Sequence, residues 1–263
     1  MSNQHRKTEQ AAKLIWNCWE NGKTIKQLPD DLRPQNRKEG YAIQTHFENF
    51  SGQSIFGWKI AATSLAGQKH IGVSGPLAGR LLKERVFFPN SKLTFGKNKM
   101  AVAEPEFAFQ MGETIKPRDI KYSQAEVMSA VVSLHPAMEL PNSRFDNFAL
   151  VGEEQLIADN ACAHEFVVGS KMPDLWRTLD LSKQEVTIAI LGGKKNEGVG
   201  ANVLGDPRIA LTWLVNELSK NNIILYAGST VTTGTCTIPI SINPGDTIVA
   251  DYGALGQLQV SLD

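Results

Sequence analysis

The spacing of apolar residues changes near Gly52, and this change narrows the folds that the chain can adopt. Before it, Ala11, Leu14 and Cys18 recur at helical spacing. After it, short runs rich in β-branched and aromatic residues alternate with glycine and proline, a pattern typical of strands. The expected strands span residues 55–61, 101–111, 137–140, 163–168, 186–191, 230–233, 247–251 and 258–262.

Two helices are expected within this β-rich part. Ser123 and Glu126 form a capping-box pattern, and the apolar positions from Val127 to Leu134 lie on one helical face. Asp206-Pro207 is a helix cap followed by proline at the first helical position. The sequence therefore predicts an α+β fold, with a helical cap over residues 1–52 and a β-rich catalytic core over residues 53–263.

Composition and missing motifs exclude several classes of protein. The 27 Lys and Arg residues balance the 27 Asp and Glu residues, so no long-range field attracts nucleic acid or an anionic membrane. The three cysteines are far apart, which argues against a disulfide framework or a thiolate zinc site. No stretch approaches the roughly 20 apolar residues of a membrane helix, and no dinucleotide, P-loop or serine-hydrolase motif occurs. We expect a cytoplasmic protein with a small-molecule substrate and no nucleic-acid or membrane partner.

Two glutamates in an apolar segment form the most informative pattern. Residues two apart in a strand share a face, so Glu104 and Glu106 point the same way. Their mutual repulsion would be relieved by a hard divalent cation such as Mg²⁺ or Mn²⁺. From this segment alone, two solvated carboxylates are the more common situation. Glu139, after a helix expected to stop at Pro136, adds a third and favours the cation. Pro105 cannot donate to a sheet, which indicates an edge or rim position.

Three further groups of polar residues each allow a structural and a functional interpretation. Lys59 in an apolar strand is more often an edge charge than a functional cation, but converging glutamates would favour a functional ammonium. Asp159 and Asn160 fit an Asx turn before a strand. Cys162 and His164 share a strand face, yet no further residue supports a thiol nucleophile.

A series of short motifs occurs in one order along most of the chain and resembles a known family. The motifs are Gly57-Trp58-Lys59-Ile60, Ala103-Glu104-Pro105-Glu106-Phe107-Ala108, Pro136-Ala137-Met138-Glu139 with Ser143-Arg144, Asp159-Asn160-Ala161, Leu204-Gly205-Asp206-Pro207, Ala227-Gly228, Thr233-Gly234-Thr235 and Pro244-Gly245-Asp246. Together they resemble the 2-keto-4-pentenoate hydratases of the fumarylacetoacetate hydrolase superfamily.

The resemblance implies a mixed β-roll core with an N-terminal helical part, a homo-oligomer, and Mg²⁺ or Mn²⁺ as cofactor. The implied substrate is a 2-hydroxy-2,4-dienoic acid from aromatic-ring degradation. Ketonisation followed by addition of water at C4 would yield a 4-hydroxy-2-oxo acid. The implied site residues are Lys59 for catalysis, Glu104, Glu106 and Glu139 for the metal, and Asp159, Asn160 and Thr235 for the substrate.

One position departs from the family pattern. Many of these hydratases carry an aspartate in a P-D-[FY]-G turn, where this chain has Pro76-Leu77. Leu77 has no proton to exchange, and Glu84 is the nearest acidic residue that could replace it. Three functions therefore stay open: a hydratase, a decarboxylase or C–C hydrolase on the same metal platform, and a non-catalytic relic.

Overall fold

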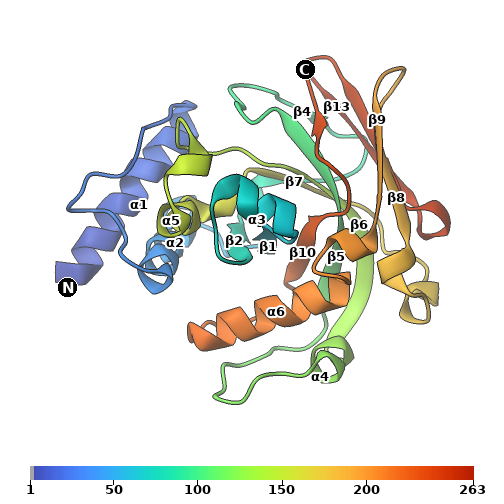
Figure 1. The fold of residues 1–263 in the computed structure, drawn as a ribbon, viewed down its shortest axis with the longest axis horizontal. Helices are drawn as coiled ribbons and strands as arrows, with labels where there is room; N and C mark the ends of the chain where they lie inside the picture. The colour runs from blue at the N-terminus through green and yellow to red at the C-terminus, as the bar shows by residue number, and fades with distance from the viewer. Residues whose placement is uncertain (1–2) are drawn as a thin grey trace.

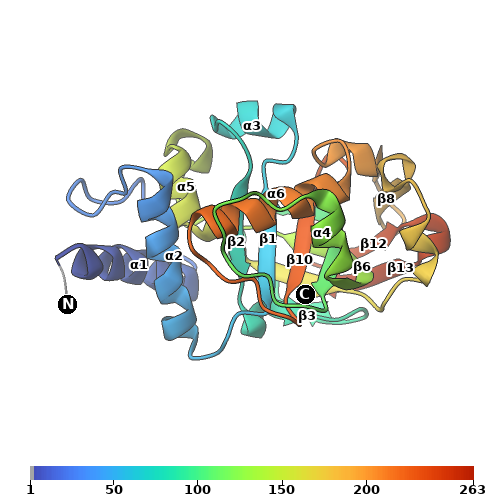
Figure 2. The same ribbon diagram turned by 90° about the horizontal axis from the view of Figure 1, so that it is seen from below.

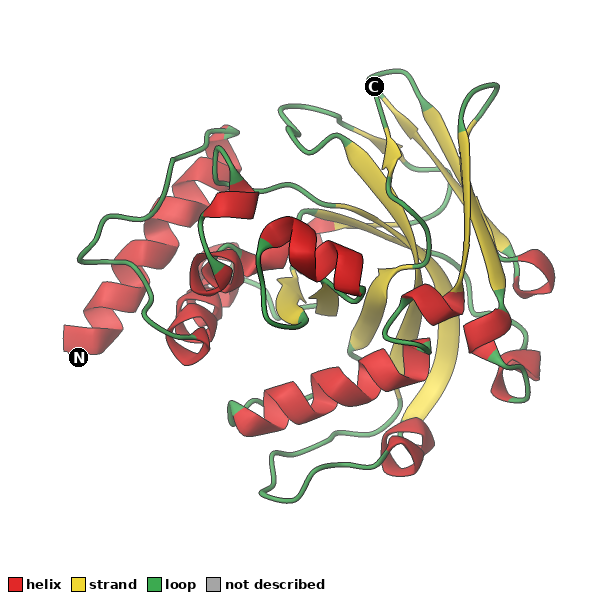
Figure 3. Ribbon diagram, in the orientation of Figure 1, coloured by secondary structure: helices red, strands yellow, loops and turns green. Residues whose placement is uncertain are grey.

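The computed structural model describes residues 3–263, in which the N-terminal helices lie on one side, most strands lie on the other, and further helices lie along the strands (Figures 1 and 3). The α-helices are α1 (Asn3–Asn21), α2 (Arg37–Ser51), α3 (Leu65–Ile71), α4 (Gln124–Ser129), α5 (Glu153–Ala158) and α6 (Pro207–Lys220). Short 3₁₀ helices are η1 (Lys83–Arg85), η2 (Phe148–Leu150), η3 (Asn160–Cys162), η4 (Asp174–Arg177), η5 (Leu181–Lys183), η6 (Gly200–Asn202) and η7 (Gly253–Leu255). Among these helices none has the length and hydrophobicity of a membrane span.

The strands form two sheets. They are β1 (Gly57–Ala61), β2 (Leu77–Leu81), β3 (Val86–Phe87), β4 (Lys92–Leu93), β5 (Val102–Met111), β6 (Val131–Leu140), β7 (Glu165–Val168), β8 (Glu185–Ile190), β9 (Lys195–Val199), β10 (Thr230–Thr235), β11 (Ile240–Ser241), β12 (Thr247–Asp251) and β13 (Gln257–Leu262). The larger sheet has the order β2-β1-β10-β5-β6-β7-β3, with β11 paired to β5. The smaller sheet has the order β4-β13-β12-β8-β9. The predicted α+β class is confirmed.

Helices α1 and α2 pack together beside the larger sheet (Figure 2). Their buried residues Ile15 and Phe47 share an apolar cluster with Leu82, Phe145 and Ala158 from later in the chain. Because this cluster excludes water from both helices, its burial holds the helical layer against the sheet. The division at residue 52 into a cap and a core stays a prediction.

One predicted helix is too long. Helix α4 begins at the expected capping box of Ser123 and Glu126 but ends at Ser129, and β6 starts at Val131. Val131 and Leu134 therefore lie in a strand. The apolar residues of this segment fit both a helix and a strand locally. Antiparallel pairing of β6 along β5 decides in favour of the strand.

Neither Pro105 nor Lys59 lies at a sheet edge, which excludes the edge interpretation of Lys59 and the edge position expected for Pro105. Strand β5 lies between β10 and β6, and β1 lies between β2 and β10. The carbonyl of Pro105 faces β10, where it accepts from the backbone N–H of Cys236 at 2.9 Å. The missing N–H of the proline faces the same side, next to the irregular β10 pairing between Thr232 and Thr235. A bulge is the other place where a sheet tolerates proline.

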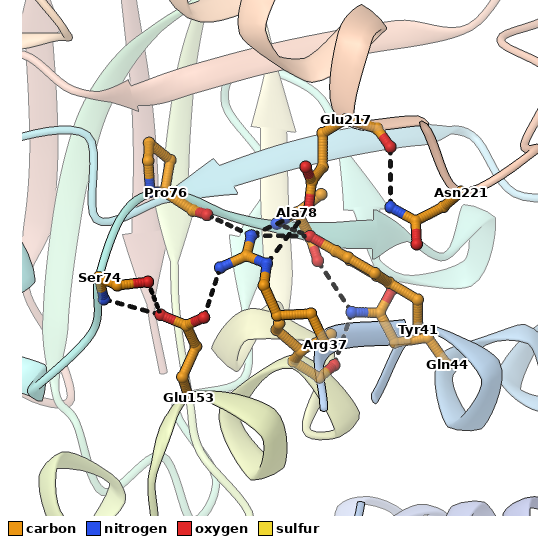
Figure 4. Close-up of polar contacts among 10 residues, drawn as sticks. Arg37, Tyr41, Gln44, Ser74, Pro76, Ala78, Glu153, Glu217 and Asn221 are labelled. Carbon is orange, nitrogen blue, oxygen red and sulfur yellow. Dashed lines mark hydrogen bonds and ion pairs between the residues drawn. The ribbon is translucent and has the colours of Figure 1, made fainter. Parts of the chain in front are cut away.

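A polar network fastens three helices to the segment that enters β2 (Figure 4). The guanidinium of Arg37 donates to Glu153 on α5 at 2.8 Å, to Glu217 on α6 at 3.0 Å and to the carbonyl of Pro76 at 2.8 Å. Glu153 also accepts from the backbone N–H of Ser74 at 2.7 Å. Charged partners at short range make these bonds strong, so the segment 74–76 is held in one position.

The backbone of Ala78 in β2 is also held by hydrogen bonds, here to uncharged side chains. The backbone N–H of Ala78 donates to the Tyr41 hydroxyl at 3.3 Å, and its carbonyl accepts from the Gln44 amide at 2.8 Å. Both partners come from α2. This helix therefore sets the position of β2, including Leu77, whose side chain is buried.

Candidate metal centre

Strand pairing brings the three predicted glutamates together. Glu104 on β5 is paired directly with Glu139 on β6, and Glu106 lies two residues further along the same face of β5. Facing residues on paired strands have Cβ atoms within about 5.5 Å. One carboxylate oxygen from each of the three lies within 4.8 Å of the others. This is a spacing at which one cation could contact all three.

The hydrogen bonds of these carboxylates leave several buried oxygens without a hydrogen-bond donor. Oε2 of Glu106 accepts from the Thr232 hydroxyl and, at 2.9 Å, from the backbone N–H of Gly234. Oε1 of Glu106 and both carboxylate oxygens of Glu139 are buried, and within residues 3–263 none of the three has a hydrogen-bond partner. A buried carboxylate oxygen without a partner is costly. Oxygen-only donors of this kind fit a hard divalent ion such as Mg²⁺.

Lys59 on β1 is the cation of the cluster. Its Nζ lies 3.1 Å from Oε2 of Glu139 as an ion pair and donates a hydrogen bond to the carbonyl of Ala161 at 2.9 Å. Only the second contact has hydrogen-bond geometry. Lys59 and Glu139 are both buried. The single ammonium therefore acts at short range and away from water, where it offsets part of the charge of the three carboxylates.

The same burial shifts the pKa of each group. Burial, with the charge of Glu139 beside it, raises the pKa of Glu104 to about 7. Burial also raises the pKa of Glu106 and of Glu139. For Lys59, burial alone would lower the pKa, but the surrounding carboxylates, Glu139 first, outweigh it and raise it. The lysine is therefore held as an ammonium.

The carbonyl that receives Lys59 lies in an unusual turn. Asn160, Ala161 and Cys162 have φ values of 56°, 50° and 61°, in the left-handed region. Non-glycine residues avoid this region at a cost of roughly 1–2 kcal/mol each. The turn approaches β2 so closely that a Cβ on Gly79 would lie 2.3 Å from the carbonyl oxygen of Asn160. Glycine at 79 thus permits the turn to reach Lys59.

Asp159 and Asn160 support this turn and do not line the cavity. Asp159 is fully buried, where it accepts from the Ser143 hydroxyl at 2.6 Å and from the Arg144 guanidinium at 2.5 Å. The Asn160 amide accepts from the backbone N–H of Arg80 at 2.6 Å and donates to its carbonyl at 2.8 Å. These bonds offset the strain of the left-handed residues.

A cavity of about 610 Å³ opens beside the cluster. Lys59, Glu104, Thr235 and Leu77 are among the residues that line it. Thr235, the third residue predicted to bind substrate, is therefore placed at the cavity. Cys162 also lines it, but burial raises the pKa of its thiol to about 12. His164 accepts from the Trp19 indole at 2.8 Å, so the two do not form a nucleophile and its base.

The sequence patterns did not predict which residues position the glutamates and the strands that carry them. Gly234 has a φ of 100°, and a Cβ there would lie 2.3 Å from the Thr63 hydroxyl oxygen. Glycine therefore lets its N–H reach Glu106. The Tyr252 hydroxyl lies 2.9 Å from the carbonyl of Glu106 and 2.6 Å from that of Ala137, which ties the residue that follows β12 to β5 and β6. The Thr-Gly motif of β10 could have indicated the contact of Gly234 with Glu106. No local sequence pattern indicates the contacts of Tyr252.

Comparison with known proteins identifies relatives among the hydratases. The chain matches no family model. It is 28% identical over 258 residues to the 2-keto-4-pentenoate hydratase of Paraburkholderia xenovorans, which covers 97% of this chain and 94% of that protein. The chain is a homologue of the 2-keto-4-pentenoate hydratases. The resemblance inferred from the motifs is thus confirmed.

Two other comparisons define the range of this homology. The 2-oxo-hept-4-ene-1,7-dioate hydratase of Escherichia coli is 28% identical over 231 residues, covering 84% of this chain and 85% of that protein. The structure of 4-oxalocrotonate decarboxylase from Pseudomonas putida G7, complexed with magnesium and adipate, superposes with a TM-score of 0.88 at 25% identity and covers 98% of both chains. The predicted fumarylacetoacetate-hydrolase type of fold is confirmed.

Proposed function

We propose that this homologue is a metal-dependent hydro-lyase that adds water to a 2-hydroxy-2,4-dienoate and forms a 4-hydroxy-2-oxo acid. The convergence of Glu104, Glu106 and Glu139 around Lys59, next to a cavity, carries the proposal. The activity named for the Paraburkholderia relative supports it, because the two chains align over nearly their full lengths.

The three glutamates hold the cofactor in this proposal. Their buried oxygens that lack hydrogen-bond partners suit Mg²⁺ or Mn²⁺, and magnesium is present in the solved structure of the decarboxylase relative. A bound ion of this kind supplies Lewis-acid stabilisation to the negative charge of an enolate. Thr232 and Gly234 orient Glu106 by occupying its other oxygen.

Lys59 moves the proton in the first step. In ketonisation the 2-hydroxyl of the dienol loses a proton and C5 gains one, which gives a 2-oxo-3-enoate. The Lys59 ammonium lies at the cavity and has an ion pair and one carbonyl contact to fix its position. Positioned acid–base groups of this kind contribute roughly 10²–10⁴-fold in rate.

Asp159 and Asn160 are proposed to act through the backbone and not on the substrate. Their side chains are fully engaged with Arg144 and Arg80. They hold the carbonyl of Ala161 where Lys59 needs it. Thr235 remains the proposed substrate contact of the three, because it lines the cavity.

The second step, addition of water at C4, lacks an evident base. Leu77 lines the cavity and cannot accept a proton. Glu84 is exposed on η1, where it accepts from the Ser51 hydroxyl at 2.8 Å, and is not among the lining residues. Leu77 is the observation that supports a second candidate, decarboxylation of a 2-oxo acid, because release of CO₂ from an enolate-forming acid needs no activated water.

One experiment separates these activities. Proton NMR of 2-hydroxypenta-2,4-dienoate and of 4-oxalocrotonate, each with EDTA or with Mg²⁺ or Mn²⁺, distinguishes ketonisation, hydration and loss of CO₂. The proposal expects metal-dependent formation of 4-hydroxy-2-oxopentanoate from the first substrate. Release of CO₂ from the second, without hydration of the first, would replace the proposal by the second candidate.

A further inference from the structure

The cavity extends well beyond the metal cluster. Its volume of about 610 Å³ falls in the range of roughly 300–1,000 Å³ that accommodates drug-sized ligands. A five-carbon acid held at Glu104 and Lys59 would leave much of this space unfilled. The chemistry of the remaining wall therefore indicates what the far end of the substrate carries.

Apart from Lys59, Glu104 and the thiol of Cys162, the charged or titratable side chains on the lining are His70 and Lys99, and both residues are exposed. Lys99 is already engaged, since its Nζ donates to the Thr24 hydroxyl at 2.6 Å and lies 3.9 Å from a carboxylate oxygen of Asp146. Within residues 3–263 no arginine lines the cavity. Apart from Lys59, the lining thus presents no buried cation to a second carboxylate.

Apolar side chains make up much of the remaining wall, which also includes the hydroxyl residues Thr63, Ser64 and Thr237. The apolar side chains come from separate elements: Ile71 from α3, Leu77 from β2, Phe148 from η2 and Leu156 from α5. Helix α3 follows β1 and projects from the sheet (Figure 2), and its His70 ring contacts Phe148 with centroids 6.2 Å apart. Two of the four, Leu77 and Leu156, are fully buried in the main core.

We infer that the substrate carries an apolar substituent, alkyl or aryl, at the end distant from its 2-oxygen, and not a second carboxylate. This rests on the proposed function, since it concerns the same site. A carboxylate among Ile71, Leu77 and Phe148 would lose its hydration without gaining an ionic partner. An alkyl chain there removes apolar surface from water on both sides. The names of the Escherichia coli relative and of the adipate complex describe dicarboxylates, so this chain would differ from them in substrate.

Binding of unreactive 2-oxo acids tests the inference without relying on turnover. Calorimetry with Mn²⁺-loaded protein compares 2-oxopentanoate, 2-oxooctanoate and 2-oxosuberate, the last two of equal carbon number. Each buried methylene favours binding about fourfold. We expect 2-oxooctanoate to bind at least about tenfold more tightly than 2-oxopentanoate, and 2-oxosuberate to bind more weakly than 2-oxooctanoate.

Variants of cavity-lining residues test whether the apolar wall determines which ligand binds. Phe148→Arg should weaken binding of 2-oxooctanoate and strengthen binding of 2-oxosuberate. If the arginine variant does not fold, Phe148→Ala should reduce the dependence of affinity on chain length. Leu150→Arg is the matched control, because Leu150 lies on the same η2, is 81% exposed and is not a lining residue. It should leave all three affinities unchanged.

The possible failures are distinct. Metal-dependent binding that ignores chain length, or that favours 2-oxosuberate in the wild-type protein, overturns the inference and leaves the proposed function standing. Absence of metal-dependent binding by all three acids overturns the proposed function together with the inference. An equal response to Phe148→Arg and Leu150→Arg would also overturn the inference, because the wall would not then select the ligand.

Discussion

The ammonium nitrogen of Lys59 lies 3.1 Å from Oε2 of Glu139, and both side chains are buried. The two residues come from β1 and β6, which are separated in the sheet by β10 and β5. An ion pair that reaches across two intervening strands needs long side chains directed to the same face. Because a buried pair is costly to desolvate, its presence indicates function more than stability.

Replacing one carboxylate should weaken metal binding strongly. Glu106→Gln keeps the shape of the side chain but removes a charged donor from a three-carboxylate set. We expect Mn²⁺ affinity to fall at least about 100-fold, since changes to outer-shell groups alone cost 10–100-fold. Calorimetry or EPR titration measures it. Glu113→Gln, an exposed glutamate just beyond β5, is the control and should bind Mn²⁺ like the wild type. Equal affinity in all three proteins would exclude this site.

The stability of the metal-free protein should fall as pH rises. The pKa of Glu104 is raised from 4.5 to about 7 in the folded chain, so between these values the folded state binds more protons than the unfolded state. Stability that depends on this proton is present below about pH 4.5 and is lost as pH rises through about 7. Glu106 and Glu139, also raised, act in the same direction.

Thermal unfolding from pH 5 to pH 8 with EDTA and with Mn²⁺ measures this effect. Bound Mn²⁺ should restore the melting temperature most at the high-pH end, where the carboxylates are ionised and protons no longer compete. A melting temperature that rises across this range in EDTA, with no larger gain from Mn²⁺ at pH 8, would contradict the prediction.

Removing the ammonium of Lys59 should reduce turnover and leave the metal in place. We expect Lys59→Met to lower kcat by roughly 10²–10⁴-fold while Mn²⁺ affinity stays within a few-fold of the wild type. Lys69→Met is a suitable control, because Lys69 is exposed on α3 and is not a lining residue of the cavity. Turnover by Lys59→Met close to that of the control would show that the lysine has no role in proton transfer.

A carboxylate at position 77 should raise hydration relative to ketonisation. Leu77 lines the cavity, and Leu77→Asp supplies a base that could deprotonate or orient water. Because Leu77 is buried, the new side chain also lowers stability, by at least about 1–3 kcal/mol as an unpaired polar group and by more when the carboxylate is ionised. NMR in D₂O follows deuterium entry into the oxo acid separately from formation of 4-hydroxy-2-oxopentanoate. Fast hydration by the wild type that Leu77→Asp slows would show that another residue handles the water.

Local sequence determined those features of the site that depend on neighbours along the chain. Glu104 and Glu106 share a face because strand residues alternate with a period of two. The starts of α4 and α6 followed from caps whose side chains bind backbone N–H groups a few residues away. The ordered motifs also sufficed to indicate the homology, because a motif is read directly from residue order.

Tertiary structure decided everything that depends on register and on packing between distant segments. The pairing of Glu104 with Glu139 is set by the alignment of β5 on β6, and a shift by one residue would turn Glu139 to the other face. The same pairing made a strand of Val131 to Leu134, whose local pattern also fits a helix. Asn160 is engaged with Arg80, 80 residues earlier. Such contacts arise only when the whole sheet forms, because their energy comes from burial that no single segment can supply.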